Sequence, residues 1–270
     1  MNPRHLLVTT LMSLCLPLAG WFAPGAQAQT EVTLGVYSFP PVASVRNNTD
    51  AEGLLGDLLA ELQADNDDIT FRIVHTSPKR RHLDFVEGLY DVAFFESTRW
   101  GWDSLPVKAT RALLMDEEVY VALNKPGRDQ SFVDNISKRR IAVISGYHYG
   151  FAGLSTDDST LEEQFRIEFS DSHYRNLSLI KADRPSLAEV AVVSRSYLRQ
   201  YLEDNPDDSD TFLVSDVPDQ AYQLRIIARD GGPVDVQTLE SMLKPLIEDG
   251  RYQQMVKDHG LDLPPELAGR

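Results

Sequence analysis

The sequence is poor in cysteine, in basic residues and in long apolar runs. One cysteine among 270 residues excludes an intramolecular disulfide framework. Lysine and arginine number 26 against 41 aspartates and glutamates, and the formal charge of −15 argues against a general nucleic-acid binder. After the N-terminal region, no stretch approaches the roughly 20 consecutive apolar residues that span a bilayer. The composition that remains is that of an ordinary globular protein, whose stability must come from core burial.

The N-terminal segment has the layout of a secretory signal peptide. Arg4 precedes an apolar run from Leu6 to Phe22, and the segment ends in Ala26-Gln27-Ala28. This pattern predicts export, cleavage before Gln29 and a periplasmic location. The alternative is a membrane anchor, which is disfavoured because three polar residues and a proline interrupt the run. Residues 1–28 are therefore treated as a targeting segment.

The rest of the chain alternates between short apolar strands and amphipathic helices. Helices are expected around residues 54–62, 83–89, 174–180, 197–202, 239–247 and 251–258. Strands are expected at residues 32–37, 71–74, 92–95, 118–123, 141–144, 165–169, 190–193, 211–214 and 224–228. Such alternation predicts crossover units and a largely parallel sheet. Asn124-Lys125-Pro126-Gly127 separates two such series, which predicts two α/β lobes.

Five segments, in this order, resemble family 3 of the bacterial extracellular solute-binding proteins, the periplasmic receptors that serve amino-acid ABC transporters. The matching segments are the Gly35 strand with Phe39-Pro40-Pro41, the helix at residues 53–59, the stretch at 85–92, the stretch at 136–144 and the ending at 246–252.

The resemblance implies a two-lobed, type II periplasmic-binding fold with two hinge strands. One lobe would comprise residues 29–123 plus 222–270, and the other residues 124–221. Hinged lobes close around a small ligand, so that a membrane permease or receptor can distinguish the loaded protein from the free one. We expect a monomer that needs no cofactor and binds no nucleic acid.

Aromatic residues are expected to wall the cleft, which in open α/β sheets lies at the carboxyl ends of the strands. Tyr37 and Phe39 follow the first strand, where the resemblance places an aromatic side chain over the ligand. Trp100 and Trp102 can wall the site and attract cations, or can pack their loop against the lobe.

Charged side chains follow the strand at residues 92–95. The resemblance implies a threonine and an arginine that hold the ligand carboxylate, and Thr98 and Arg99 are the candidates, although their spacing departs from the family pattern. Glu96 at the strand end would favour a cationic group, or would form a surface pair with an arginine. The basic run at residues 79–82 is expected to be an exposed helix start or a partner contact.

Two further segments complete the expected cleft. Gly146 fits the family's anion-binding turn, whereas Tyr147 and His148 stand where threonines are usual and indicate a larger or more aromatic ligand. For His148 a hydrogen-bonding or stacking role is favoured over metal binding, because no second histidine lies nearby. Ser194 occupies the position where amino-acid receptors place the aspartate that binds the ligand ammonium, which weakens the case for an ordinary α-amino acid.

These features favour a receptor for an amino acid or a related amine, acting in uptake. A sensory protein that reports to a membrane receptor is the first alternative. The second is an enzyme similar to the cyclohexadienyl dehydratases, in which Glu96 or His148 would supply acid–base chemistry. The chain lacks a nucleophile motif, a phosphate loop and a zinc signature, so the sequence predicts a binding protein and not an enzyme.

Overall fold

Strands and helices alternate along residues 29–269, the part of the chain that the computed structural model describes. The predicted signal peptide lies outside these residues. The strands are β1 (Thr30–Val36), β2 (Ser44–Arg46), β3 (Asp50–Glu52), β4 (Ile69–His75), β5 (Val92–Glu96), β6 (Val107–Ala109), β7 (Leu114–Leu123), β8 (Arg140–Ile144), β9 (Arg166–Ser170), β10 (Val190–Ser194), β11 (Phe212–Val214) and β12 (Gln220–Arg229). The helices are α1 (Leu54–Asp65), α2 (Arg81–Val86), α3 (Asp158–Gln164), α4 (His173–Lys181), α5 (Arg195–Asp204), α6 (Val236–Glu248), α7 (Arg251–Asp258) and α8 (Pro265–Ala268).

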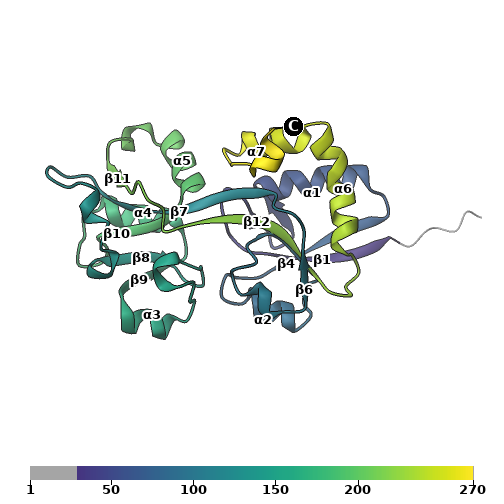
Figure 1. The fold of residues 1–270 in the computed structure, drawn as a ribbon, viewed down its shortest axis with the longest axis horizontal. Coiled ribbons are helices and arrows are strands. Elements are labelled where there is room, and N and C mark those ends of the chain that lie inside the picture. The colour runs from purple at the N-terminus through teal and green to yellow at the C-terminus, as the bar shows by residue number, and fades with distance from the viewer. Residues whose placement is uncertain (1–28, 270) are drawn as a thin grey trace, which may run out of the picture.

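The elements form two lobes joined by two long strands (Figure 1). In the first lobe β1 lies parallel to β4 and β5, and α1, α2, α6 and α7 lie around these strands. In the second lobe β8 lies parallel to β9 and β10, with α3, α4 and α5 around it. Strands β7 and β12 run antiparallel to each other from one lobe into the other. Such a pair of extended crossings is a hinge that lets two rigid bodies move.

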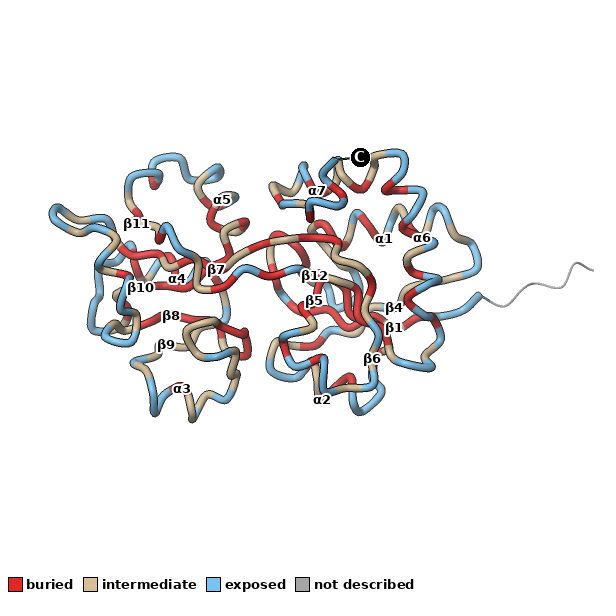
Figure 2. The backbone as a smooth tube through the Cα atoms, in the orientation of Figure 1, coloured by how far each residue is buried: buried red, intermediate tan, exposed pale blue. Residues whose placement is uncertain are grey.

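Strands β5, β8 and β10 are buried almost throughout, whereas β4 and β9, at the edges of the sheet, contain no buried residue (Figure 2). The cores of the lobes are made of aliphatic residues, for example Val32, Leu34 and Val92 in the first lobe and Val121, Ala191 and Val193 in the second. Within residues 29–269, no helix has the length and apolar character needed to cross a membrane.

The predicted strands and helices are confirmed, with corrections. The sheet is parallel only inside each lobe, since β12 pairs antiparallel with β5 and β7 pairs antiparallel with β10. Helix α2 ends earlier than expected, because the following Gly88 takes a left-handed φ of 78° that a helix cannot continue through. The hairpin of β2 and β3 and helix α3 were not predicted. The predicted lobe boundaries at residues 123/124 and 221/222 stay a prediction.

Candidate functional site

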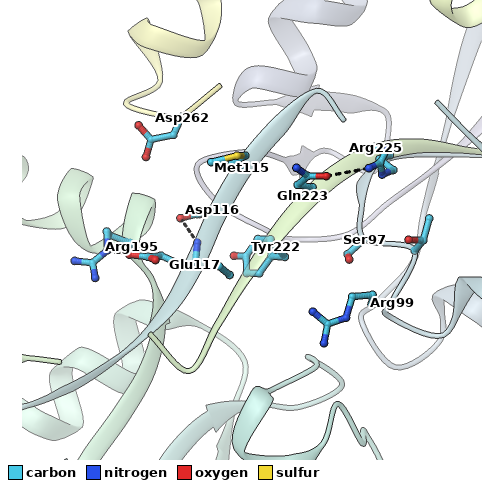
Figure 3. Close-up of a pocket in the computed structure, with 12 residues that line it drawn as sticks. Ser97, Arg99, Met115, Asp116, Glu117, Arg195, Tyr222, Gln223, Arg225 and Asp262 are labelled. Carbon is cyan, nitrogen blue, oxygen red and sulfur yellow. Dashed lines mark hydrogen bonds and ion pairs between the residues drawn. The ribbon is translucent and has the colours of Figure 1, made fainter. Parts of the chain in front are cut away.

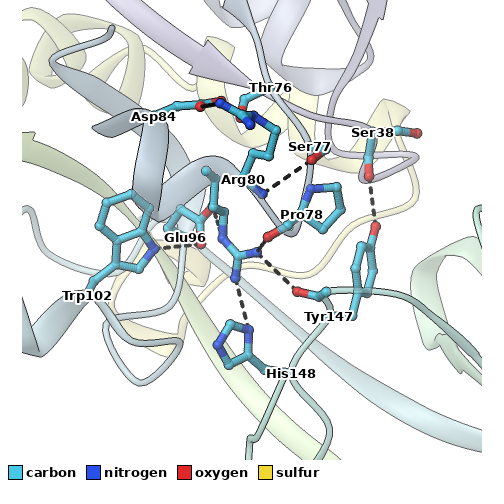
Figure 4. Close-up of polar contacts among 12 residues, drawn as sticks. Ser38, Thr76, Ser77, Pro78, Arg80, Asp84, Glu96, Trp102, Tyr147 and His148 are labelled. Carbon is cyan, nitrogen blue, oxygen red and sulfur yellow. Dashed lines mark hydrogen bonds and ion pairs between the residues drawn. The ribbon is translucent and has the colours of Figure 1, made fainter. Parts of the chain in front are cut away.

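A buried ion pair lies on the first lobe's side of the gap between the lobes. Arg81 begins α2 and Glu96 ends β5, and their exposed fractions are only 2% and 0%. Arg81 Nε lies 3.3 Å from Glu96 Oε1, and Trp102 Nε1 donates a hydrogen bond of 2.8 Å to the other carboxylate oxygen (Figure 4). Burial raises the pKa of Glu96, while Arg81 and Trp102 act in the opposite direction. Glu96 is thus engaged by its own lobe.

The guanidinium of Arg81 reaches the second lobe. It donates to the carbonyl oxygens of Pro78 and Gly146, the latter at 3.2 Å, and lies 2.9 Å from Nδ1 of His148. Burial and the neighbouring Arg81 lower the pKa of His148 to about 2, so the neutral ring accepts this hydrogen bond. The expectation that residues 79–82 are exposed is therefore wrong for Arg81, although Lys79 and Arg80 are exposed. Arg81, a residue of the first lobe, thus forms hydrogen bonds with two residues of the second lobe.

Gly146 permits a close approach of the two lobes. Its φ is +83°, and a Cβ on it would lie 2.6 Å from the backbone nitrogen of Lys79 in the first lobe. A side chain at this position would therefore clash with the turn that precedes α2. The glycine serves backbone contact between lobes in addition to any role in anion binding.

Aromatic rings from both lobes meet beside Arg81. The ring of Phe39 lies 6.1 Å from Trp100 and 5.8 Å from Tyr147, and Tyr37 lies 6.4 Å from Tyr147. The hydroxyl of Tyr147 donates a 2.8 Å hydrogen bond to the carbonyl of Ser38 across the gap between the lobes (Figure 4). These four rings, which we call the ring cluster, are Tyr37, Phe39, Trp100 and Tyr147.

The ring cluster, Arg81, His148 and Glu118 enclose a cavity of about 10 Å³. This is room for about one water molecule, because the lobes touch. Tyr147 and His148 come from the second lobe, so separation of the lobes enlarges the cavity.

Glu118 closes this cavity from the hinge strand β7. It is 2% exposed, and its Oε2 makes no hydrogen bond within the described residues. Its Oε1 accepts only a long bond of 3.4 Å from Tyr222. Burial, together with the charges of Asp116 and Asp219, raises the pKa of Glu118 well above its ordinary value. Few protein groups therefore stabilise a negative charge on Glu118.

A second, open cavity of about 660 Å³ lies beside the hinge strands (Figure 3). Thr98 and Arg99 line it, together with Tyr222 and Arg225 from β12 and with Asp262. Tyr222, whose ring lies 4.9 Å from that of Trp100, connects it with the ring cluster. We call this cavity the hinge groove.

The structure divides the residues proposed from sequence into three groups. Tyr37, Phe39, Trp100, Tyr147 and His148 line the small cavity together, and Gly146 lies next to Arg81. Glu96 lies behind Arg81, and Thr98 and Arg99 line the hinge groove. Ser194 is fully buried at the start of α5, with no partner for its Oγ among residues 29–269, and pairs in register with Glu118.

Sequence reasoning missed Arg81 and Glu118. Arg81 was one of three consecutive basic residues, and its polar neighbours Arg80 and His82 gave no sign that it alone of the three is buried. Glu118 begins the predicted strand at residues 118–123, and an acid within an otherwise apolar strand was the signal that could have identified it.

Comparisons with known proteins establish the fold. No protein-family model matches the chain, and no curated protein matches it. Solved structures do match. An ABC uptake transporter substrate-binding protein from Streptococcus pneumoniae, with bound histidine, is 16% identical with a TM-score of 0.68, over 87% of this chain and 95% of that one. The chain has the fold of the two-lobed, type II periplasmic binding proteins.

A second ligand-bound protein and a sensor domain also match the structure of this chain. The protein Tv2483, bound to L-arginine, is 16% identical with a TM-score of 0.64, over 90% of this chain and 95% of that one. A histidine kinase sensor domain with similarity to periplasmic binding proteins is 14% identical with a TM-score of 0.67, over 88% of this chain and 99% of that one. The resemblance to the family 3 solute-binding proteins is thus confirmed for the fold.

Proposed function

We propose that this type II binding fold captures a small polar molecule, an amino acid or a related amine, between its lobes. The observation that supports this most is that side chains from both lobes converge on one crevice: Phe39 and Trp100 from the first, Tyr147 and His148 from the second. A ligand in that crevice touches both lobes and stabilises their contact. The solved structures with bound histidine and L-arginine support the ligand class.

A thermal-shift screen tests this proposal. Purified residues 29–270 would be heated with a panel of amino acids, amines and small organic acids. A ligand at 100 times its dissociation constant adds about 2.7 kcal/mol to the stability, and so raises the melting temperature. We expect a rise with at least one amine-bearing compound, confirmed by titration calorimetry. No rise across the panel would contradict the proposal.

Uptake by an ABC transporter is the role we propose first, with the protein acting as a periplasmic monomer that presents its loaded form to a permease. The sensor-domain neighbour favours a second candidate, reporting to a membrane receptor. Deletion of the gene separates the two. Loss of uptake of the radiolabelled ligand indicates transport, whereas unchanged uptake with a lost transcriptional response indicates sensing.

An enzyme on this scaffold is the less favoured alternative. Glu96 is held by Arg81 and Trp102 inside its own lobe, and His148, with its pKa lowered to about 2, is uncharged at neutral pH and has its Nδ1 occupied by Arg81. Turnover of a cyclic prephenate-type acid by purified protein, abolished in Glu96→Gln, would reverse this ranking.

A further inference from the structure

Glu118 is the polar group in the cavity that its own protein leaves least satisfied. A buried carboxylate normally acquires a cation or two or three hydrogen bonds, because burial without partners is costly. Among the described residues no lysine, arginine or histidine forms an ion pair with Glu118, and its Oε2 has no donor. The side chain nevertheless lines the small cavity between the lobes.

The neighbours of Glu118 on the hinge sheet are polar and lie on the same face. Ser194 of β10 and Gln220 of β12 are both paired with Glu118 in antiparallel register, and such directly opposite residues share a face. Gln220 is already engaged, since it donates to the carbonyl of His148 and accepts from Trp100. Within residues 29–269 the Ser194 hydroxyl has no hydrogen-bond partner, so it can support a group bound at Glu118.

The opposite side of the cavity is neutral. Arg81 and Glu96 cancel each other's charge within the first lobe, and His148 is uncharged at neutral pH. An ionised Glu118 therefore gives the cavity one net negative charge. A ligand that balances this charge carries one positive charge.

The rings favour the same kind of ligand. Trp100, Tyr147 and Phe39 present aromatic surface to the cavity, and the faces of aromatic rings attract ammonium groups. The ring of Tyr37 is partly covered by the Arg81 guanidinium, 5.2 Å from its centroid. The other three rings and one carboxylate make a cage that suits an organic cation.

The site offers little to a ligand carboxylate. Arg81 is the cation that lines the cavity, and its nitrogens are directed to Glu96, Pro78, Gly146 and His148. Arg99, which the sequence suggested for this purpose, lines the hinge groove instead. A carboxylate here would compete with contacts that hold the lobes together.

We propose that the cavity takes an organic monocation, a protonated or methylated amine without a carboxylate, with Glu118 as its counterion and Trp100, Tyr147 and Phe39 as its walls. This inference rests on the proposed function, because it names the ligand class of the same crevice. The cation enters when separation of the lobes moves Tyr147 and His148 away from the first lobe. Because the cavity of about 10 Å³ holds only about one water molecule, closure brings these two side chains over the cation at a wider separation of the lobes than in the ligand-free protein.

The test uses choline as the cation and 3,3-dimethyl-1-butanol as its uncharged analogue of nearly the same shape. Titration calorimetry would measure both with the wild-type protein, with Glu118→Gln and with the control Asp208→Asn. Asp208 is a buried acid of the second lobe that neither lines the cavity nor is among the charges that raise the pKa of Glu118. We expect choline to bind the wild-type protein and the control equally within about threefold, and to bind Glu118→Gln about 30-fold or more weakly.

Each outcome separates this inference from the proposed function. Equal binding of choline and its uncharged analogue, or equal binding to wild type and Glu118→Gln, would overturn the role of Glu118. Binding of an amino acid with none of choline would overturn the monocation but leave the proposed function standing. No binding by any member of the panel would overturn both. The comparison of choline with its uncharged analogue uses the wild-type protein alone, so it remains valid even if Glu118→Gln fails to fold.

Discussion

Two buried glutamates lie near the small cavity, Glu118 in its wall and Glu96 behind Arg81, and their surroundings are opposite in kind. Glu96, on the first lobe, lies 3.3 Å from Arg81 and accepts a hydrogen bond from Trp102. Glu118, on the hinge, has one long bond to Tyr222 and an oxygen without a partner in the described chain. A charge that is paired inside one lobe supports that lobe, whereas a buried charge left unpaired costs stability. Glu96 therefore supports its own lobe, and Glu118 is the carboxylate that we propose as the counterion of a ligand.

The largest expected change in stability comes from breaking the ion pair between Arg81 and Glu96. Arg81→Met leaves Glu96 buried without its cation, and we expect the free energy of unfolding to fall by about 3–5 kcal/mol. Urea denaturation followed by circular dichroism measures this value. Arg80→Met is the matched control, because Arg80 is exposed and its pair with Asp84 should contribute at most about 1 kcal/mol.

The double variant Arg81→Met, Glu96→Gln sharpens the test. Removal of both charges should restore a large part of the lost stability, since the buried carboxylate no longer needs a partner. An Arg81→Met protein as stable as the Arg80→Met control would contradict the structural role of the pair.

Replacement of the other glutamate, Glu118, is expected to raise the stability of the protein. Glu118→Gln should stabilise the ligand-free protein by about 1–3 kcal/mol at pH 8, because an amide costs less to bury than a carboxylate. The pKa of Glu118 is raised in the folded protein, so the folded state holds its proton longer than the unfolded state does. The wild type therefore loses stability as the pH rises from the ordinary glutamate pKa through the raised one, and the variant lacks this contribution of Glu118 to the loss.

Thermal unfolding from pH 4 to 8 measures this difference. The titratable groups around Glu118 are Asp116, Asp219, Tyr222, Tyr147, Tyr149 and Arg81, and all are present in both proteins, so their direct contributions largely cancel. A Glu118→Gln variant that is less stable than wild type at pH 8 would show that the protein itself satisfies this carboxylate.

A smaller effect concerns the contact between the lobes. Tyr147→Phe removes the hydrogen bond to the Ser38 carbonyl, which is worth about 1 kcal/mol, so the ratio of closed to open protein should fall about fivefold. Residues 29–270 contain no cysteine, so dyes on cysteines placed at exposed Leu89 and Tyr174 report the lobe separation by fluorescence transfer. Tyr149→Phe is the control, because the Tyr149 hydroxyl bonds to Ile144 within the second lobe. If the two variants change the fluorescence transfer equally, the hydrogen bond between Tyr147 and Ser38 does not stabilise the closed form.

The smallest effect is spectroscopic. The pKa of His148 is lowered to about 2 by burial and by Arg81, so its ring should stay neutral from pH 4 to 8. Nitrogen chemical shifts of the imidazole should be constant over this range in the wild-type protein. A titration of His148 near pH 6.5 would show that the ring is solvated and does not accept from Arg81.

The sequence alone predicted the fold well and the polar half of the site poorly. Strand and helix positions follow from local apolar periodicity, which each segment carries by itself. The rings at Tyr37, Phe39, Trp100 and Tyr147 also follow locally, because they stand directly after strands that end at the cleft. Arg99 follows a strand too, but the loop after β5 directs it into the hinge groove.

The roles of Arg81 and Glu118 depend on contacts between distant segments, so local pattern gave no sign of Arg81 and marked Glu118 only as an acid in an apolar strand. Arg81 meets Glu96 from another element and His148 from another lobe. Glu118 faces Ser194 and Gln220 only because three strands pair at the hinge. Such juxtapositions are properties of topology and not of any one segment.

The most direct test of the account is to locate the bound cation. Crystals grown with arsenocholine, in which arsenic replaces the choline nitrogen, would be measured at the arsenic absorption edge. The account predicts one anomalous peak between the Glu118 carboxylate and the rings of Trp100 and Tyr147. A peak in the hinge groove beside Arg99 and Asp262, or no peak at all, would contradict it.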